Sequence, residues 1–176
     1  LDEILSGKSK ISEARSIKLE DLIFRDIAKM DKKNIIKTFK NKTIFITGAG
    51  GSIGKVISRQ LISVKPEKLI FLDFSEYNLY KLKNELGSLD FNQSENFFIL
   101  GSCCDEKLIF EIFDKYKIDI VIHCAAYKHV PMVENNILVG LSNNIFSTRI
   151  ITKAALKNNI EKAILISTDK AVRPTN

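Results

Sequence analysis

Five short apolar runs follow one another along residues 43–168, and stretches with helical spacing separate them. Within each run the apolar residues are consecutive, and many are β-branched or aromatic, which is typical of strands covered on both faces. The runs are TIFIT (43–47), KLIFLDF (68–74), NFFIL (96–100), DIVIHCA (119–125) and KAILIST (162–168). The pattern predicts five strands of a parallel sheet.

Four amphipathic stretches between these runs predict connecting helices, because their apolar residues recur every three or four positions. Pro66 ends the first stretch and Gly87 the second. The apolar positions are Ile53, Val56, Ile57, Leu61 and Val64; Leu79, Leu82 and Leu86; Leu108, Ile109, Ile112, Phe113 and Tyr116; and Ile137, Leu141, Ile145, Thr148 and Ile151. Strands that alternate with helices form right-handed βαβ units. We therefore expect an α/β fold: a Rossmann-type doubly wound parallel sheet with strand order 3-2-1-4-5.

The first 40 residues differ from the rest. Residues 1–18 are polar and irregular, whereas LEDLIFRDIAKM (19–30) has helical spacing, with acids early and lysine late. We expect residues 1–40 to form an N-terminal arm with one helix and residues 41–176 to form the α/β domain. Because the chain begins with Leu1, we interpret it as a piece of a longer protein.

The composition is that of a soluble globular protein, with 45% hydrophobic and 27% charged residues. No apolar run approaches the ~18–20 residues that span a bilayer. The net charge of +6 raises the question of a nucleic-acid partner, but the lysines are spread along the chain without a recognised binding motif. We therefore expect no nucleic-acid binding.

One lysine cluster stands apart just before the first predicted strand, with Asp31 as its single acid. A solvated linker is the favoured interpretation, and contact with an anionic membrane surface is the alternative. The cluster comprises Lys29, Lys32, Lys33, Lys37, Lys40 and Lys42.

Three cysteines, Cys103, Cys104 and Cys124, have no metal-ligand spacing, and the two histidines do not complete a zinc site with them. Adjacent cysteines are poor disulfide partners. We expect reduced, buried thiols of a cytoplasmic domain and no metal site.

The segment TIFITGAGGSIGK (43–55) concentrates glycines where the first predicted strand ends. Glycine costs roughly 1 kcal/mol relative to alanine in regular structure, so this density needs a local reason. Gly48, Gly51 and Gly54 have the spacing of a dinucleotide-binding loop. In such a loop one glycine permits the turn, another admits a pyrophosphate, and the last lets helix and strand pack closely. A structural turn that binds nothing is the alternative.

An acid at the end of the second strand is the next feature of a dinucleotide site, because it holds the adenosine ribose. Asp73, in FLDFSE, lies 19 residues after Gly54. A carboxylate there accepts from the 2′-hydroxyl and repels a 2′-phosphate, which favours NAD over NADP. Alternatively, or in addition, Asp73 caps the helix that starts near Ser75.

Three longer motifs, TGAGGSIG, HCAAYKHVPMVE and ISTDKAVRPTN, resemble the extended short-chain dehydrogenase/reductase superfamily. The resemblance is to its polysaccharide-biosynthesis-type 4,6-dehydratases, which act on UDP-N-acetylglucosamine. It covers nearly the whole chain, including IKLEDLIFRD upstream, which resembles the linker of long, membrane-anchored members. The resemblance implies NAD as cofactor, a UDP-sugar as substrate and a homo-oligomeric parent. It places the parent at the bacterial inner membrane, with this domain on the cytoplasmic side.

The resemblance also implies roles for individual residues. Asp73 would hold the ribose, and Asn144 matches an asparagine of the family's fourth helix, whereas Ser147 replaces a glycine that is usual nearby. The expected cofactor-binding residues are Thr47, Gly48, Gly50, Gly51, Ser52, Ile53 and Gly54 at the pyrophosphate, Ser102 and Cys103 at the adenine, and Ala125, Ala126 and Tyr127 beside the fourth strand. Lys128 and His129 would meet the substrate at the mouth of the site. Solvent exposure is the alternative for Lys128, and capping or packing is the alternative for His129.

The family's catalytic triplet matches Thr168, Asp169 and Lys170, at the carboxyl end of the fifth predicted strand, where open α/β sheets bind their ligands. Loss of water after oxidation at C4 of the sugar needs a base for C5, an acid for the C6 hydroxyl and a hydrogen bond at the C4 oxygen. We assign these roles to Lys170, Asp169 and Thr168 respectively. An exposed ion pair at a strand end is the alternative for the acid and the lysine.

The superfamily's Tyr-x-x-x-Lys or Met-x-x-x-Lys element would follow PTN, at a position beyond Asn176. We therefore interpret residues 41–176 as the NAD-binding domain without the substrate lobe, and expect the chain alone to be inactive. A nucleotide-sugar epimerase and a non-catalytic NAD-binding sensor are the alternative functions.

Overall fold

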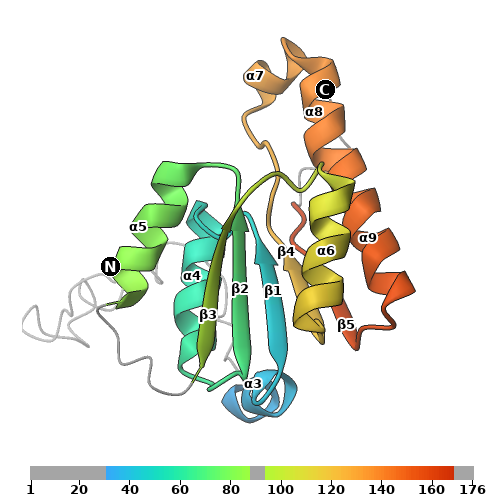
Figure 1. The fold of residues 1–176 in the computed structure, drawn as a ribbon. Helices are drawn as coiled ribbons and strands as arrows, with labels where there is room; N and C mark the ends of the chain where they lie inside the picture. The colour runs from blue at the N-terminus through green and yellow to red at the C-terminus, as the bar shows by residue number, and fades with distance from the viewer. Residues whose placement is uncertain (1–30, 88–93, 169–176) are drawn as a thin grey trace, which may run out of the picture. The chain divides into compact units, whose positions relative to one another are not determined.

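The computed structural model describes residues 31–87 and 94–168. In these residues a parallel sheet has the order β3-β2-β1-β4-β5, which confirms the predicted fold (Figure 1). The strands are β1 (Thr43–Thr47), β2 (Lys68–Asp73), β3 (Glu95–Leu100), β4 (Ile120–His123) and β5 (Lys162–Leu165). Each lies close to its predicted position, because consecutive apolar residues suit a strand covered on both faces.

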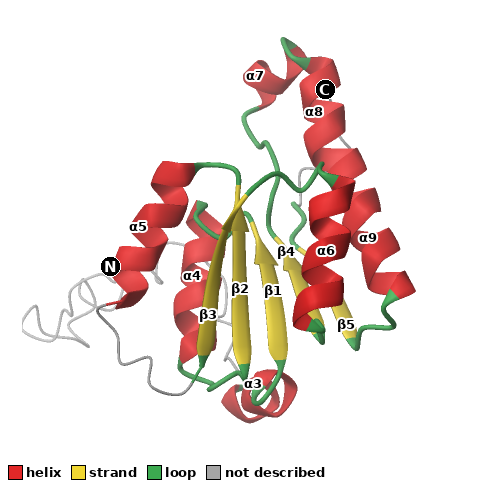
Figure 2. Cartoon of the chain, viewed as in Figure 1, coloured by secondary structure: helices red, strands yellow, loops and turns green. Residues whose placement is uncertain are grey.

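Helices cover both faces of the sheet (Figure 2). The helical elements of the described residues are α3 (Lys32–Phe39), α4 (Ser52–Ile62), α5 (Glu76–Gly87), α6 (Glu106–Tyr116), α7 (Val130–Glu134), α8 (Ile137–Leu141), the π-helical turn η2 (Ser142–Phe146) and α9 (Ser147–Lys157). One core cluster joins α4 and α5 to the sheet, and a second joins α6 and α9 to its other face. Because all the strand pairs are parallel, the carboxyl ends of these strands lie along the same edge of the sheet.

The lysine-rich segment before β1 is helical rather than a simple linker. Helix α3 has no fully buried residue, and its Ile35 and Phe39 pack against the core cluster that contains residues of α4 and α5. Its lysines, including Lys32 and Lys37, are exposed, as expected for a solvated face. The helix predicted over residues 19–30 lies outside the described residues, and the division at residue 40 stays a prediction.

The fourth predicted helix is divided among three elements and is buried over only part of its length. Its apolar residues fall on α8, η2 and α9, and only the last part is buried: Ile151 is 3% exposed, whereas Ile137 is 62% and Ile145 56% exposed. The reason is visible in Figure 1, where α7 and α8 lie beyond the carboxyl ends of the strands, with no sheet beneath them. No described helix is both long and apolar enough to cross a membrane.

Candidate functional site

The glycine loop connects β1 to α4 at the carboxyl edge of the sheet. Gly48 has a φ of +61°, which is open to glycine, and a Cβ there would lie 2.8 Å from the backbone of Ala125. A Cβ on Gly54 would lie 2.1 Å from the Gly48 carbonyl oxygen. These contacts explain two of the glycines: the first permits the turn, and the last lets the helix pack against the loop.

The N-terminus of α4 is the polar centre of this loop. Gly51 is the N-cap residue, and no side chain of the described residues caps the first turn. The first backbone N–H groups of a helix have no intrahelical partner and carry the positive end of the helix dipole. Ser52 and Ile53 line a cavity of about 550 Å³ at this point. The arrangement is suited to an anion such as a pyrophosphate.

Asp73, at the end of β2, is 5% exposed and braces the glycine loop. Its Oδ2 accepts a hydrogen bond from the Gly50 N–H at 2.9 Å, and its Oδ1 accepts one from the Ser75 N–H at 2.9 Å. The Ser75 hydroxyl in turn accepts from the Asn78 N–H at the start of α5. Asp73 therefore shapes the turn before α5, and its oxygens keep lone pairs for a further donor.

A smaller cavity, of about 120 Å³, lies beside Asp73. Its lining includes Asp73, the residues predicted at the adenine, Ser102 and Cys103, and those predicted beside the fourth strand, Ala125, Ala126 and Tyr127. The structure therefore brings these predicted cofactor-binding residues together with the predicted ribose-binding acid. Burial raises the pKa of the Cys103 thiol to about 12, so this side chain is a neutral packing group.

Tyr127 lines both cavities, and its backbone is held by a side chain of η2. Its N–H donates to Asn144 Oδ1 at 2.8 Å, and Asn144 Nδ2 donates to its carbonyl oxygen at 3.0 Å. The Tyr127 ring contacts Phe74 edge-on, with 6.2 Å between centroids. The sequence identified Asn144 as a match to the family, but it did not predict these two hydrogen bonds to the Tyr127 backbone.

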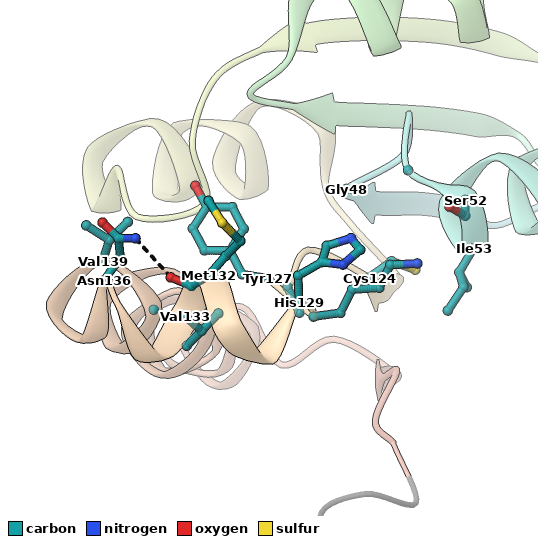
Figure 3. A pocket seen from close by; sticks show the side chains of 15 residues that line it. Gly48, Ser52, Ile53, Cys124, Tyr127, His129, Met132, Val133, Asn136 and Val139 are labelled. Atoms are coloured by element: carbon teal, nitrogen blue, oxygen red, sulfur yellow. Dashed lines mark hydrogen bonds between the residues drawn. The ribbon is translucent and has the colours of Figure 1, made fainter.

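The far wall of the larger cavity comes from α7 and α8 (Figure 3). Lys128 and His129 also line it, as do Met132 and Val133 of α7. His129 is the N-cap residue of α7, but its ring makes no capping hydrogen bond, and its backbone carbonyl accepts from the Met132 N–H. The His129 imidazole lines the larger cavity.

A buried polar cluster that sequence reasoning missed lies beneath the site. His123, 3% exposed, has Nδ1 2.6 Å from Thr47 Oγ1 and Nε2 3.2 Å from Thr148 Oγ1. Burial lowers the pKa of its imidazole to about 4. In the sequence, this histidine is the polar residue at the end of an apolar run and the first residue of the HCAAYKHVPMVE motif, but the motif gave it no predicted role.

The predicted catalytic triplet is described only in part. Thr168 is exposed and follows β5. The Ile166 N–H donates to the His123 carbonyl oxygen at 3.0 Å, so the segment that leads to Thr168 runs beside the end of β4, at the edge that carries the glycine loop. Asp169 and Lys170 lie outside the described residues, and their roles stay predictions.

The fold and the glycine loop are those of a Rossmann-type domain, and comparison with known proteins specifies the family. Residues 44–176 match the polysaccharide biosynthesis protein family, and the chain belongs to it. The chain is 36% identical over all of its length to capsular polysaccharide biosynthesis protein CapD of Staphylococcus aureus, and covers 29% of that protein. It is 36% identical over 78% of its length to an inverting UDP-N-acetylglucosamine 4,6-dehydratase of Campylobacter jejuni, and covers 40% of it.

Among solved structures, the UDP-glucose 4-epimerase of Bifidobacterium longum, in complex with NAD+ and UDP, superimposes with a TM-score of 0.61. It is 26% identical, and the match covers 73% of this chain and 37% of the epimerase. The relatives thus include nucleotide-sugar dehydratases and epimerases, and this chain spans less than half the length of each of them.

Proposed function

We propose that the chain is the NAD-binding part of a nucleotide-sugar 4,6-dehydratase, which converts UDP-N-acetylglucosamine to a UDP-4-keto-6-deoxy sugar for polysaccharide biosynthesis. The observation that carries the proposal is the uncapped N-terminus of α4, which meets a glycine loop between two cavities. The larger cavity is lined by Lys128 and His129, and the smaller by Asp73. The match to the dehydratase of Campylobacter jejuni supports the reaction type.

The residues present fit a dinucleotide. The first N–H groups of α4 would bind the pyrophosphate, because Gly51 carries no side chain and a Cβ there would meet only the Gly48 carbonyl oxygen, at 3.2 Å. Asp73 would accept a hydrogen bond from the adenosine ribose with its remaining lone pairs. Its buried negative charge would repel a 2′-phosphate, which favours NAD over NADP.

The larger cavity would take the nicotinamide end and the sugar. NAD, when bound, supplies a hydride acceptor for C4 of the sugar and a hydride donor for C6. Lys170 would remove the proton at C5, Asp169 would protonate the leaving C6 hydroxyl, and Thr168 would donate a hydrogen bond to the C4 oxygen. The acid and the base are adjacent in sequence, so they need environments that separate their pKa values.

Lys128 and His129 are proposed to contact the UDP-sugar, because both line the larger cavity together with residues of the glycine loop. Membrane anchoring of the parent protein and its homo-oligomeric state remain predictions from the resemblance.

A nucleotide-sugar epimerase is the second candidate, favoured by the superposition on the epimerase of Bifidobacterium longum. Incubation of the full-length protein with UDP-N-acetylglucosamine separates the candidates by product. A 4-keto-6-deoxy sugar supports the dehydratase, and a C4 epimer supports the alternative. NAD binding without turnover of either UDP-N-acetylglucosamine or UDP-glucose would favour a non-catalytic sensor.

A further inference from the structure

The imidazole of His123 bridges the sheet and helix α9. His123 ends β4 and is paired in register with Thr47, the last residue of β1. Its Nδ1 lies 2.6 Å from Thr47 Oγ1, and its Nε2 lies 3.2 Å from Thr148 Oγ1 and 3.4 Å from Ser147 Oγ. One buried ring therefore contacts the start of the glycine loop on one side and the start of α9 on the other.

The protons of the two α9 hydroxyls are already committed. Thr148 Oγ1 donates to the Asn144 carbonyl oxygen at 2.8 Å, and Ser147 Oγ donates to the Asn143 carbonyl oxygen. A hydroxyl has one proton and two lone pairs, so both groups accept from the ring. Nε2 therefore carries the imidazole proton. Nδ1 is then unprotonated, and its lone pair accepts a hydrogen bond from the Thr47 hydroxyl.

The chain of hydrogen bonds connects two segments that line the cavities of the site, the glycine loop and the backbone at Tyr127. Thr47 immediately precedes Gly48, the glycine with positive φ that opens the loop. At the other end, the carbonyl of Asn144 belongs to η2, and the side chain of the same residue clamps the backbone of Tyr127. A π-helical turn departs from the usual i−4 bonding, and these hydroxyls supply donors for its carbonyls.

We propose that His123, as the neutral Nε2–H tautomer, is a positioning residue. It holds the glycine loop and the η2 turn in a fixed relative position, and so sets the shape of the two cavities that are proposed to bind the dinucleotide. This inference rests on the proposed dinucleotide binding. His123 itself lines neither cavity and acts through Thr47 and Asn144. A ring that merely fills the core would affect stability without affecting cofactor affinity.

The tautomer is read directly by NMR of protein labelled with ¹⁵N-histidine, with the signals assigned by their loss in His123→Gln. The expected result is a protonated Nε2 and an unprotonated Nδ1 from pH 5.5 to pH 8. A protonated Nδ1 in this range would overturn the proposal, because the Thr47 hydroxyl could not then donate to the ring.

The positioning role is tested by titration of NAD into three variants. His123→Phe keeps a ring but loses the hydrogen bonds of both ring nitrogens, and should raise the NAD dissociation constant about tenfold. His123→Gln keeps a donor near the Nε2 position and should restore part of the affinity; it decides the question if His123→Phe does not fold. The matched control is Ser63→Ala, which removes an exposed hydroxyl-to-carbonyl bond of 2.7 Å at the C-terminal end of α4. It should bind NAD as the unmodified protein does.

Folded His123 variants that bind NAD with unchanged affinity would overturn this inference and leave the proposed function intact. Failure of the unmodified protein to bind NAD or NADP would overturn both the proposed function and the positioning role.

Discussion

Asp73 Oδ2 accepts the backbone N–H of Gly50 at 2.9 Å, across 23 residues of sequence. The acid that is proposed to hold the ribose therefore also fixes the turn that is proposed to hold the pyrophosphate. Loss of the carboxylate consequently has two separable effects. One is on cofactor choice, through charge, and the other is on loop geometry, through the hydrogen bond.

Asp73→Asn should reduce the preference for NAD over NADP and keep part of the loop structure, because its amide oxygen can still accept from Gly50, whereas an NH2 donor replaces the oxygen that accepts from Ser75. Asp73→Ala should also weaken both cofactors and lower the free energy of unfolding by about 1–3 kcal/mol, because a buried N–H loses its acceptor. Titration of both cofactors, with urea unfolding, measures the two effects. An unchanged NAD-to-NADP ratio in both variants would show that Asp73 does not face the 2′ position.

Gly51 and Gly54 should respond differently to a side chain. Gly51→Val should fold, because φ is −71° and a Cβ would meet only one atom at 3.2 Å, but should raise the NAD dissociation constant about a hundredfold by blocking the α4 N–H groups. Gly54→Ala should fail to fold, because its Cβ would lie 2.1 Å from a carbonyl oxygen.

Gly87→Ala is the control for these glycine variants, because a Cβ there meets no described atom within 4 Å. It should retain both folding and NAD affinity. Circular dichroism and calorimetric titration provide the readouts. NAD binding by Gly51→Val as tight as that of the unmodified protein would place the pyrophosphate elsewhere.

His123 should make stability depend on pH. The unfolded chain takes up a proton on this residue near pH 6.5, whereas burial lowers the pKa in the folded protein to about 4. The free energy of unfolding should therefore fall as the pH drops from about 6.5 to about 4, by about 3 kcal/mol from this group. Its hydrogen-bonding neighbours Thr47, Ser147 and Thr148 are uncharged. Urea unfolding at a series of pH values in this range measures the effect. The free energy of unfolding should change less with pH for His123→Gln than for the unmodified protein.

The sequence predicted the sheet because consecutive apolar runs separated by helical patterns leave few other arrangements. It also placed Gly48, Gly51, Gly54 and Asp73 at one edge. It did not predict the bond from Gly50 to Asp73 or the clamp of Asn144 on Tyr127, because these depend on how separate βα units meet in space. The exposure of Ile137 was missed for a related reason: helical spacing identifies an apolar face but not whether a sheet lies beneath it.

The roles assigned to Asp169 and Lys170 are tested in the full-length protein. Asp169→Asn cannot deliver a proton to the C6 hydroxyl, and Lys170→Met cannot accept the C5 proton. General acid and base groups typically contribute ~10²–10⁴-fold, so each change should lower turnover by about that factor. NAD affinity should change little, because neither side chain is proposed to hold the pyrophosphate or the adenosine. Turnover at the unmodified level in both variants would remove the triplet from the mechanism.

The central claim, that this domain serves a 4,6-dehydratase, is tested most directly by the reaction of the full-length protein with UDP-N-acetylglucosamine in deuterium oxide. Proton removal at C5, followed by reprotonation from solvent, predicts a 4-keto-6-deoxy product that carries deuterium at C5, as seen by mass spectrometry and NMR. A C4 epimer that retains its original C5 proton, or unchanged substrate from protein saturated with NAD, would contradict the claim.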